Sequence, residues 1–212
     1  MRPCVIFTES NIKRAISIAE KFSIAEVRMD LCQFRSQYLS EIFSLPIEII
    51  ATYREADSTN ASVQKMEQLK KAMSAGASFI DVELMLNSQQ RDDLISFAKG
   101  YGVKVIISYH NFDKTPSQKE LKEIIDQSRQ IGADIVKIAT KVNFRDDCLN
   151  LLNLYQGEEN IVAFGMGEDA KFTRITSLFL GAPFTYVHYI SGSKTAEGQI
   201  GYKEFEAIIE NL

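Results

Sequence analysis

The sequence predicts an α/β fold in which eight strands alternate with helices and close into a (β/α)8 TIM barrel. Three observations predict it: short apolar runs recur along the whole chain, segments with helical spacing separate them, and glycines stand where those helices should end. Repeated strand–helix units are typical of a parallel sheet covered by helices. Eight such units favour a closed barrel over an open, doubly wound sheet.

The strands are predicted from the apolar runs, each of which is followed by a segment with helical character. The eight predicted strands are residues 3–8, 24–31, 47–54, 78–84, 103–109, 134–140, 160–166 and 184–190. The chain has 212 residues, fewer than the roughly 250 that are usual for such a barrel, so the loops should be short. We expect a single domain, residues 1–212.

The helices are predicted from spacing and from end signals. Helical spacing is clear at Ile12, Ala15, Ile16 and Ala19, and again at Leu121, Ile124, Ile125 and Ser128. Ser117 and Glu120 have the spacing of a capping box, which predicts the start of the fifth helix. Glycines are expected where helices end, at Gly76, at Gly100 with Gly102, and at Gly132.

The composition excludes several classes of protein. With a net charge of -4, the chain offers no electrostatic case for nucleic acid or an anionic membrane as its main partner. No apolar run approaches the roughly 20 residues that span a bilayer, and the N-terminus lacks the layout of a secretory signal, so a cytoplasmic protein is expected. The cysteines form no CxxC pair, which argues against a disulfide framework or a zinc site: Cys4, Cys32 and Cys148.

Polar residues share one face of several predicted strands. Successive side chains of a strand point to opposite faces, so alternate residues line the inside of a barrel. The polar members of these alternate sets are Glu26, Arg28, Asp30, Thr52, Arg54, Asp81, Glu83, Ser108, His110 and Lys137. One charge near a strand end would simply reach water. Five strands with this pattern predict a charged pocket at the carboxyl end of the barrel, where active sites of this fold lie.

Lys137 lies in the middle of the sixth predicted strand, DIVKIAT. Because an unpaired buried ammonium ion is costly, a lysine at this position indicates a function. Desolvation and nearby cations favour the neutral, nucleophilic amine, which forms a Schiff base with a carbonyl substrate. The alternative is a structural ion pair with Asp81 or Glu83. His110 ends the preceding strand and is a candidate general acid–base.

The last quarter of the chain holds further candidates. Arg174 lies in the first turns of the helix after the seventh strand, close to the expected pocket. His188 shares a face of the eighth strand with two aromatic residues. The loop SGSKTAEGQIGY that follows is rich in small polar residues. It can fold over a ligand, with Thr195 and Gln199 as donors, or be an ordinary surface loop.

A glycine pattern follows the seventh strand, Gly165-x-Gly167-x-x-Ala170. It matches the glycine fingerprint of dinucleotide-binding proteins. It comes late in the chain, however, and no acidic residue ends the next strand to bind a ribose. We therefore discount a dinucleotide site.

Together, these segments resemble the type I 3-dehydroquinate dehydratases of the shikimate pathway. The matching segments, in order, are EVRMDL, TYR, DVEL, SYHNF, VKIAT, the spacing from Met166 to Arg174, and TAEGQIGY. The resemblance extends over essentially the whole chain and implies the barrel fold, although the N-terminal hairpin often found in the family is absent. It implies elimination of water from 3-dehydroquinate to give 3-dehydroshikimate, without a metal or organic cofactor.

The resemblance also implies roles for individual residues. Lys137 would form an imine with the substrate ketone, and His110 would move protons. Substrate-binding roles fall on Glu26, Arg28, Arg54, Arg174, Thr195 and Gln199, with Arg174 on the carboxylate. The expected pocket walls are Phe112, Met166 and His188.

The sequence departs from the family pattern at several of these positions. The family's glutamate after TYR is replaced by Ser58, with Asp57 beside it as a candidate to orient the histidine. Asn111 replaces an aspartate next to His110. In the loop, Thr195 replaces the family's serine and Glu197 replaces its proline. His188 replaces an aromatic residue.

Two other functions remain open from the sequence alone. One is another lysine-dependent barrel enzyme, such as a class I sugar-phosphate aldolase, which would bind phosphate. The other is a barrel that binds ligands without catalysis. The expected partner is the small-molecule substrate, together with a homodimer and with fusion to, or association with, shikimate dehydrogenase.

Overall fold

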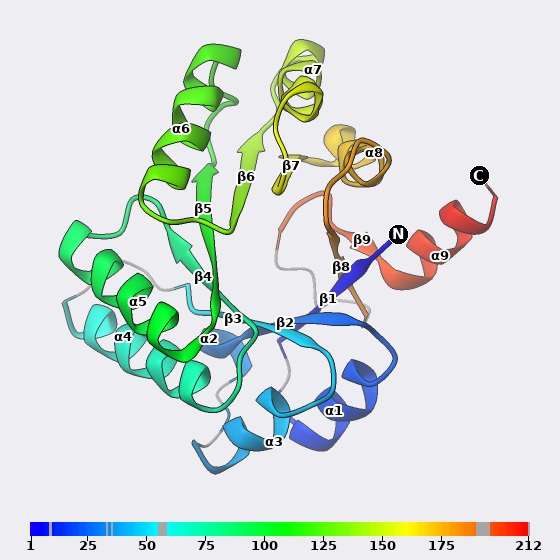
Figure 1. The fold of residues 1–212 in the computed structure, drawn as a ribbon. Helices are drawn as coiled ribbons and strands as arrows, with labels where there is room; N and C mark the ends of the chain where they lie inside the picture. Colours follow the sequence, from blue (N-terminus) through cyan, green and yellow to red (C-terminus); the bar gives the residue numbers. More distant parts are fainter. Residues whose placement is uncertain (9, 33, 35, 55–58, 190–195, 212) are drawn as a thin grey trace. The chain divides into compact units, whose positions relative to one another are not determined.

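The computed structural model describes residues 1–8, 10–32, 34, 36–54, 59–189 and 196–211 (Figure 1). By their internal contacts they form two compact units. We call these the N-terminal unit, Cys4–Ile106, and the C-terminal unit, Met1–Pro3 with Ile107–Leu212. The hydrogen-bonded order of the strands is β7-β6-β5-β4-β3-β2-β1-β8-β9. The strand pairs with a described register are parallel, which confirms the predicted α/β class.

The N-terminal unit contains four strand–helix repeats and the start of a fifth strand. Its elements are β1 (Pro3–Phe7), α1 (Ile12–Ala19), β2 (Ile24–Arg28), α2 (Met29–Cys32), η1 (Ser36–Tyr38), α3 (Leu39–Phe43), β3 (Glu48–Thr52), α4 (Thr59–Ser74), β4 (Phe79–Glu83), α5 (Ser88–Tyr101) and β5 (Lys104–Asn111), the last of which continues into the C-terminal unit. Helices α4 and α5 lie side by side in Figure 1.

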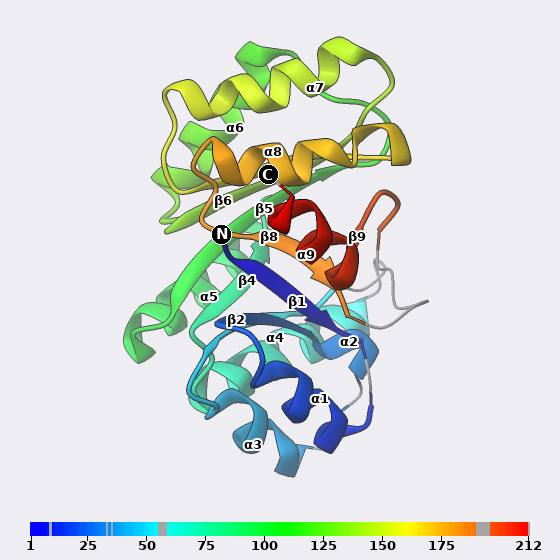
Figure 2. The same cartoon turned by 90° about the vertical axis from the view of Figure 1, so that its right-hand side faces the viewer.

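The C-terminal unit continues the same alternation. Its further elements are α6 (Gln118–Gln130), β6 (Ile135–Lys141), α7 (Arg145–Leu152), η2 (Asn153–Gln156), β7 (Ile161–Met166), η3 (Glu168–Ala170), α8 (Phe172–Phe179), β8 (Thr185–His188), β9 (Ile200–Gly201) and α9 (Tyr202–Glu210). Figure 2 shows α6, α7 and α8 together along the strands β6 and β7.

The local signals for helix ends are mostly confirmed. The predicted capping box is present, with Ser117 accepting from the backbone N–H of Glu120 and the Glu120 carboxylate accepting from the backbone N–H of Ser117. Gly102 ends α5 in the left-handed conformation at φ 68°. Gly100 was predicted to lie at the end of this helix together with Gly102. It lies inside the last turn instead, because the chain leaves the helix only at Gly102.

The strand parity is confirmed for β6. Helices α6 and α7 pack against Val136 and Ile138, which belong to one hydrophobic cluster with Leu121, Ile125, Leu151 and neighbouring β7 residues. Lys137 lies between these two residues in the strand and is not part of the cluster. Since alternate residues of a strand point to opposite faces, Lys137 points away from the helices. Its side chain is therefore held on the inner face of the strand.

Two strand predictions were wrong in detail. The second strand ends at Arg28 instead of residue 31, and the next residues form α2. The alternation of polar and apolar residues continues through Asp30, but Arg28 closes a local ion pair with Asp30 two residues on, which favours a turn of helix. The third strand ends at Thr52, so Arg54 lies beyond it. In addition, the structure has a ninth, two-residue strand, β9.

Two predictions from composition can be compared with the structure. All three cysteines that the sequence analysis considered are buried. In the described ranges, no helix combines the length and the apolar composition that crossing a bilayer requires.

Candidate active site

Lys137 is the buried lysine that the sixth strand was predicted to carry. Its side chain is 7% exposed, and its Nζ lies 4.3 Å from the centroid of the Tyr186 ring of β8. The face of an aromatic ring attracts a lysine head group and so helps to hold it in place. Strands β6 and β8 thus fix the position of this amine.

Arg174 extends from the first turn of α8 to the same group of aromatic rings. Its guanidinium carbon lies 3.9 Å from the centroid of the Phe164 ring, and the Phe164 ring meets Tyr186 edge-on at 6.2 Å. Phe184 packs edge-on against Tyr186 at 5.4 Å. Lys137 and Arg174 therefore contact one cluster of three buried aromatic residues in the C-terminal unit.

The charge of Arg174 is not balanced within the described part of the chain. The side chain is 1% exposed, and its Nε and Nη2 are buried without a hydrogen-bond partner among the described residues. This burial lowers the pKa of Arg174 to about 10, and the nearby Tyr186 only partly opposes the shift. Buried polar groups normally have partners, so this guanidinium is suited to bind an anion.

His110 is held near the end of β5 by local structure. Its ring stacks on Phe112 with centroids 6.2 Å apart, while Phe112 itself is 74% exposed. Between them, Asn111 accepts hydrogen bonds from the backbone N–H groups of Asp113 and Lys114, both at 3.0 Å. Asn111 therefore turns the chain directly after the histidine.

The remaining candidates of the C-terminal unit lie at strand ends. Met166 is buried and ends β7, and His188 ends β8 beside Gly201 of β9. Gln199, which directly precedes β9, is 1% exposed. Thr195 lies outside the described residues.

The N-terminal unit forms a second polar group on its strands. Glu26 is buried in β2 and accepts a hydrogen bond of 2.8 Å from the hydroxyl of Thr52 in β3. Arg28 makes a bidentate ion pair with Asp30 at 3.1 and 2.8 Å. Burial opposes the charge of Arg28, but Asp30 and Glu26 outweigh it, so the pKa of Arg28 is raised.

Arg54 belongs to a chain of ion pairs in the same unit. It lies 2.6 Å from the buried Asp81 and 3.7 Å from Glu83, which is 2.5 Å from Lys65 of α4. Burial alone would lower the pKa of Arg54, but these carboxylates raise it above its usual value. Asp81 and Glu83, which the sequence offered as structural partners of Lys137, thus pair with Arg54 and Lys65. Asp57 lies outside the described residues.

Sequence reasoning missed two residues of these groups. The ring of Tyr186 contacts the amine of Lys137. The only indication of this residue in the sequence was that it shares a strand face with His188 in FTYVHYI. Lys65 is buried beside Glu83, yet it lies on a helix whose mixed polar pattern predicts exposure. Both contacts are tertiary, so spacing along the chain could not reveal them.

The glycine motif after β7 has a packing role. A Cβ on Gly165 would lie 2.6 Å from both the Ala170 Cβ and the Val142 Cγ2. Gly167 has φ 112°, a conformation that favours glycine. These contacts explain the glycines without a dinucleotide.

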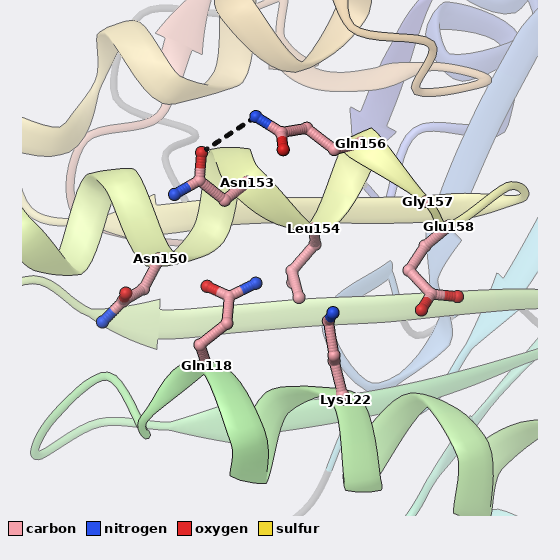
Figure 3. A pocket seen from close by; sticks show the side chains of 8 residues that line it. All are labelled: Gln118, Lys122, Asn150, Asn153, Leu154, Gln156, Gly157 and Glu158. Atoms are coloured by element: carbon pink, nitrogen blue, oxygen red, sulfur yellow. Dashed lines mark hydrogen bonds between the residues drawn. The ribbon is translucent and has the colours of Figure 1, made fainter.

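A polar pocket lies apart from these candidates, on the outer side of the C-terminal unit. It has a volume of about 660 Å³ and lies between α6 and the segment formed by α7 and η2 (Figure 3). Its lining residues are Gln118, Lys122, Asn150, Asn153, Leu154, Gln156, Gly157 and Glu158. None of the predicted site residues lines it.

Comparison with known proteins identifies the family. The family model for type I 3-dehydroquinase matches residues 3–212. The chain belongs to the type I 3-dehydroquinase family. It is 35% identical to a 3-dehydroquinate dehydratase of Methanocaldococcus jannaschii over 212 residues, which cover 93% of this chain and 92% of the relative.

Solved structures agree with the family assignment. A 3-dehydroquinate dehydratase of Aquifex aeolicus is 26% identical, with a TM-score of 0.80 over 100% of this chain and 99% of its own. A type I enzyme of Clostridium difficile with covalently modified comenic acid is 25% identical, with a TM-score of 0.82 over 99% and 91% of the two chains. These likenesses confirm the predicted (β/α)8 barrel fold.

The family fixes the reaction class. The chain is a 3-dehydroquinate dehydratase of type I, a carbon–oxygen lyase that eliminates water in the shikimate pathway. This family match decides against a sugar-phosphate aldolase. Within the described residues, no group of three or more His, Cys, Asp or Glu side chains is arranged to hold a metal ion.

Proposed function

We propose that Lys137 is the imine-forming residue of this enzyme and that His110 is its acid–base. The neutral amine of Lys137 attacks the C3 ketone of 3-dehydroquinate, and water leaves as the imine forms. The protonated imine then withdraws electrons from C2. His110 removes the C2 proton, the C1 hydroxyl leaves as water with a proton returned by His110, and hydrolysis of the imine releases 3-dehydroshikimate.

The observation that carries this proposal is the shared aromatic cluster under Lys137 and Arg174. Lys137 is buried with its Nζ over Tyr186, and Arg174 is buried over Phe164 with two nitrogens lacking partners among the described residues. Lys137 can react with a ketone and Arg174 can bind a carboxylate. Their position on one cluster therefore suits a substrate that carries both groups. We assign the substrate carboxylate to Arg174, which can bind it with two parallel hydrogen bonds.

The other candidates receive binding roles by their match to the family motifs. Glu26 and Arg28 bind the ring hydroxyls, and Arg54 supports the same region of the substrate. The ion pairs and hydrogen bonds of these residues in the N-terminal unit support fixed side-chain positions. Gln199 and Thr195 close over the substrate and exclude water from the imine. Met166, Phe112 and His188 form walls, and Asp57 orients His110.

The decisive experiment is trapping of the imine. The intact protein is incubated with 3-dehydroquinate and then with borohydride, and the mass is measured. We expect an adduct that maps to Lys137 and is absent from Lys137→Met. The matched control is Lys104→Met, because Lys104 is also a strand lysine next to an aromatic ring, 5.4 Å from the Phe79 centroid, but is exposed.

An adduct at another lysine would move the catalytic role away from Lys137. Measurable binding of 3-dehydroquinate without any adduct would mean that the chain retains only ligand binding.

The proposal extends to the setting of the enzyme. A biosynthetic dehydratase of this kind works in the cytoplasm. The homodimer and the association with shikimate dehydrogenase are proposed on the resemblance alone.

A further inference from the structure

The segment that precedes β9 brings Gln199 into the C-terminal unit. Residues Ala196–Gln199 lead directly into β9, which pairs in parallel with β8 through Val187 with Ile200 and His188 with Gly201. Gln199 is 1% exposed, and its backbone N–H donates to the Ala196 carbonyl at 3.4 Å. The orientation of Gln199 therefore depends on how the short segment before it is held.

A backbone contact holds this segment against the end of β7. The N–H of Gly167 donates to the carbonyl of Glu197 at 3.4 Å. A Cβ on Gly198 would lie only 2.2 Å from the Gly167 carbonyl oxygen. Both glycines have positive φ, 112° and 73°. The two backbones can approach this closely because Gly198 has no side chain.

An ion pair holds the same segment against the end of β6. Lys141 is the last residue of β6, and its Nζ lies 3.0 Å from Oε2 of Glu197. The two side chains are 34% and 61% exposed, so the pair is an interaction in high dielectric and is screened by salt. Lys141 also lies four residues after Lys137 on the same strand. The segment is thus tied to the ends of two neighbouring strands, one of which carries Lys137.

We propose that Lys141 and Glu197 are positioning residues that hold Gln199 in its substrate-binding orientation. The glycine contact sets how near the segment lies to β7, and the ion pair sets its place along the strand ends. Neither charged residue touches the reacting atoms. The inference rests on the proposed role of Gln199 as a substrate ligand. It adds the ion pair of Lys141 and Glu197 as a contact that holds this ligand in place.

The test compares steady-state kinetics of Glu197→Gln and Lys141→Gln with the wild type. Because an exposed ion pair contributes up to about 1 kcal/mol, we expect KM for 3-dehydroquinate to rise by up to about five-fold while kcat changes less than two-fold. Lys141→Arg keeps the charge and should restore the wild-type KM. The ratio of variant to wild-type KM should approach one in 0.5 M salt. The control Glu123→Gln removes the same charge from the exposed Lys119–Glu123 pair on α6 and should leave KM unchanged.

A readout without turnover separates this inference from the proposed function. Hydrogen exchange should be faster in Glu197→Gln than in the wild type at the backbone amides of Gly167 and Gln199. If the enzyme forms no imine but this exchange still increases, the proposed function fails and the positioning contact stands. If the exchange and KM are both unchanged, or if Lys141→Arg behaves like Lys141→Gln, the inference is overturned.

Discussion

Arg174 differs from the other two candidate arginines in how its charge is balanced. Arg28 and Arg54 each pair with a carboxylate, and their pKa values are raised. Arg174 has Phe164 beneath it and buried nitrogens that lack partners in the described ranges, and its pKa is lowered to about 10. Of these three arginines, Arg174 is therefore the one best suited to bind an anionic ligand.

This imbalance predicts opposite effects of Arg174→Met on stability and on activity. Since the pKa falls from 12.5 to about 10, the buried charge costs up to about 3 kcal/mol at neutral pH, where the guanidinium is protonated in both folded and unfolded states. Replacing an unbalanced buried charge by an apolar side chain should raise the free energy of unfolding by about 1–3 kcal/mol. Loss of a charge-assisted contact should lower kcat/KM at least about ten-fold.

Urea unfolding and steady-state kinetics on the same preparations would measure both effects. Arg129→Met serves as the control, because Arg129 pairs with Glu158 on the surface and should affect neither quantity strongly. A clear loss of stability in Arg174→Met would show that the guanidinium is balanced in the free protein.

At the scale of single residues, parity in strands was the most informative property of the sequence. It identified the buried Lys137, Glu26 and Asp81, because the alternation of a strand fixes which side chains share a face. It could not identify the ring beneath Lys137 or the buried Lys65. Those depend on which distant elements meet, and spacing within one element contains no such information.

At the scale of elements, β7 and the turn after it are packed without spare room. A methyl group on Gly165 would meet Ala170 and Val142 at 2.6 Å. We therefore expect Gly165→Ala to lower the free energy of unfolding by about 1–3 kcal/mol, because a close-packed core resists added volume. Gly100→Ala should have the opposite sign: Gly100 lies inside α5 with nothing within 4 Å of the added Cβ, so the change should stabilise by about 0.5–1 kcal/mol.

Denaturant unfolding of both variants tests this pair. Equal effects of the two substitutions would contradict the packing account of the glycine motif. A dinucleotide site would predict a different result, because substitution of a phosphate-binding glycine should change ligand affinity more than stability.

Elements were predicted well where local chemistry decides their ends. The capping box at Ser117 depends on residues three positions apart, and both hydrogen bonds are present. The end of β2 was missed because the polar–apolar alternation continues past Arg28. The helical turn that replaces the strand has no capping signal in the sequence, and a periodicity of two does not show where pairing with β1 and β3 stops.

At the scale of the whole molecule, the regular strand–helix alternation predicted the fold, and the solved relatives confirm it. The family model matches residues 3–212, so the sequence likeness extends over both compact units. The sequence could not predict which of the buried charged residues pair with one another. This pairing depends on which acid meets which base after folding.

The whole molecule should lose stability in alkali, and the buried thiol of Cys32 should contribute to the first part of the loss. Cys32 is buried, its Sγ donates to the Phe7 carbonyl at 3.2 Å, and desolvation raises its pKa from 9.0 to about 12. The folded chain thus keeps this proton between pH 9 and 12, while the unfolded chain releases it. The stabilising contribution is complete below pH 9 and falls by about 1.4 kcal/mol per pH unit above it.

Denaturant unfolding at pH 8, 9 and 10 would measure this effect. The free energy of unfolding of Cys32→Ala should fall less steeply between pH 9 and 10 than that of the wild type, so the two curves converge by about 1 kcal/mol. Tyr155→Phe should change the fall between pH 9 and 10 by less than about 0.5 kcal/mol, because burial raises the pKa of Tyr155 above its ordinary value of 10 and most of its contribution is lost above pH 10. Parallel curves for Cys32→Ala and the wild type would mean that the thiol ionises as readily in the folded chain as in the unfolded one.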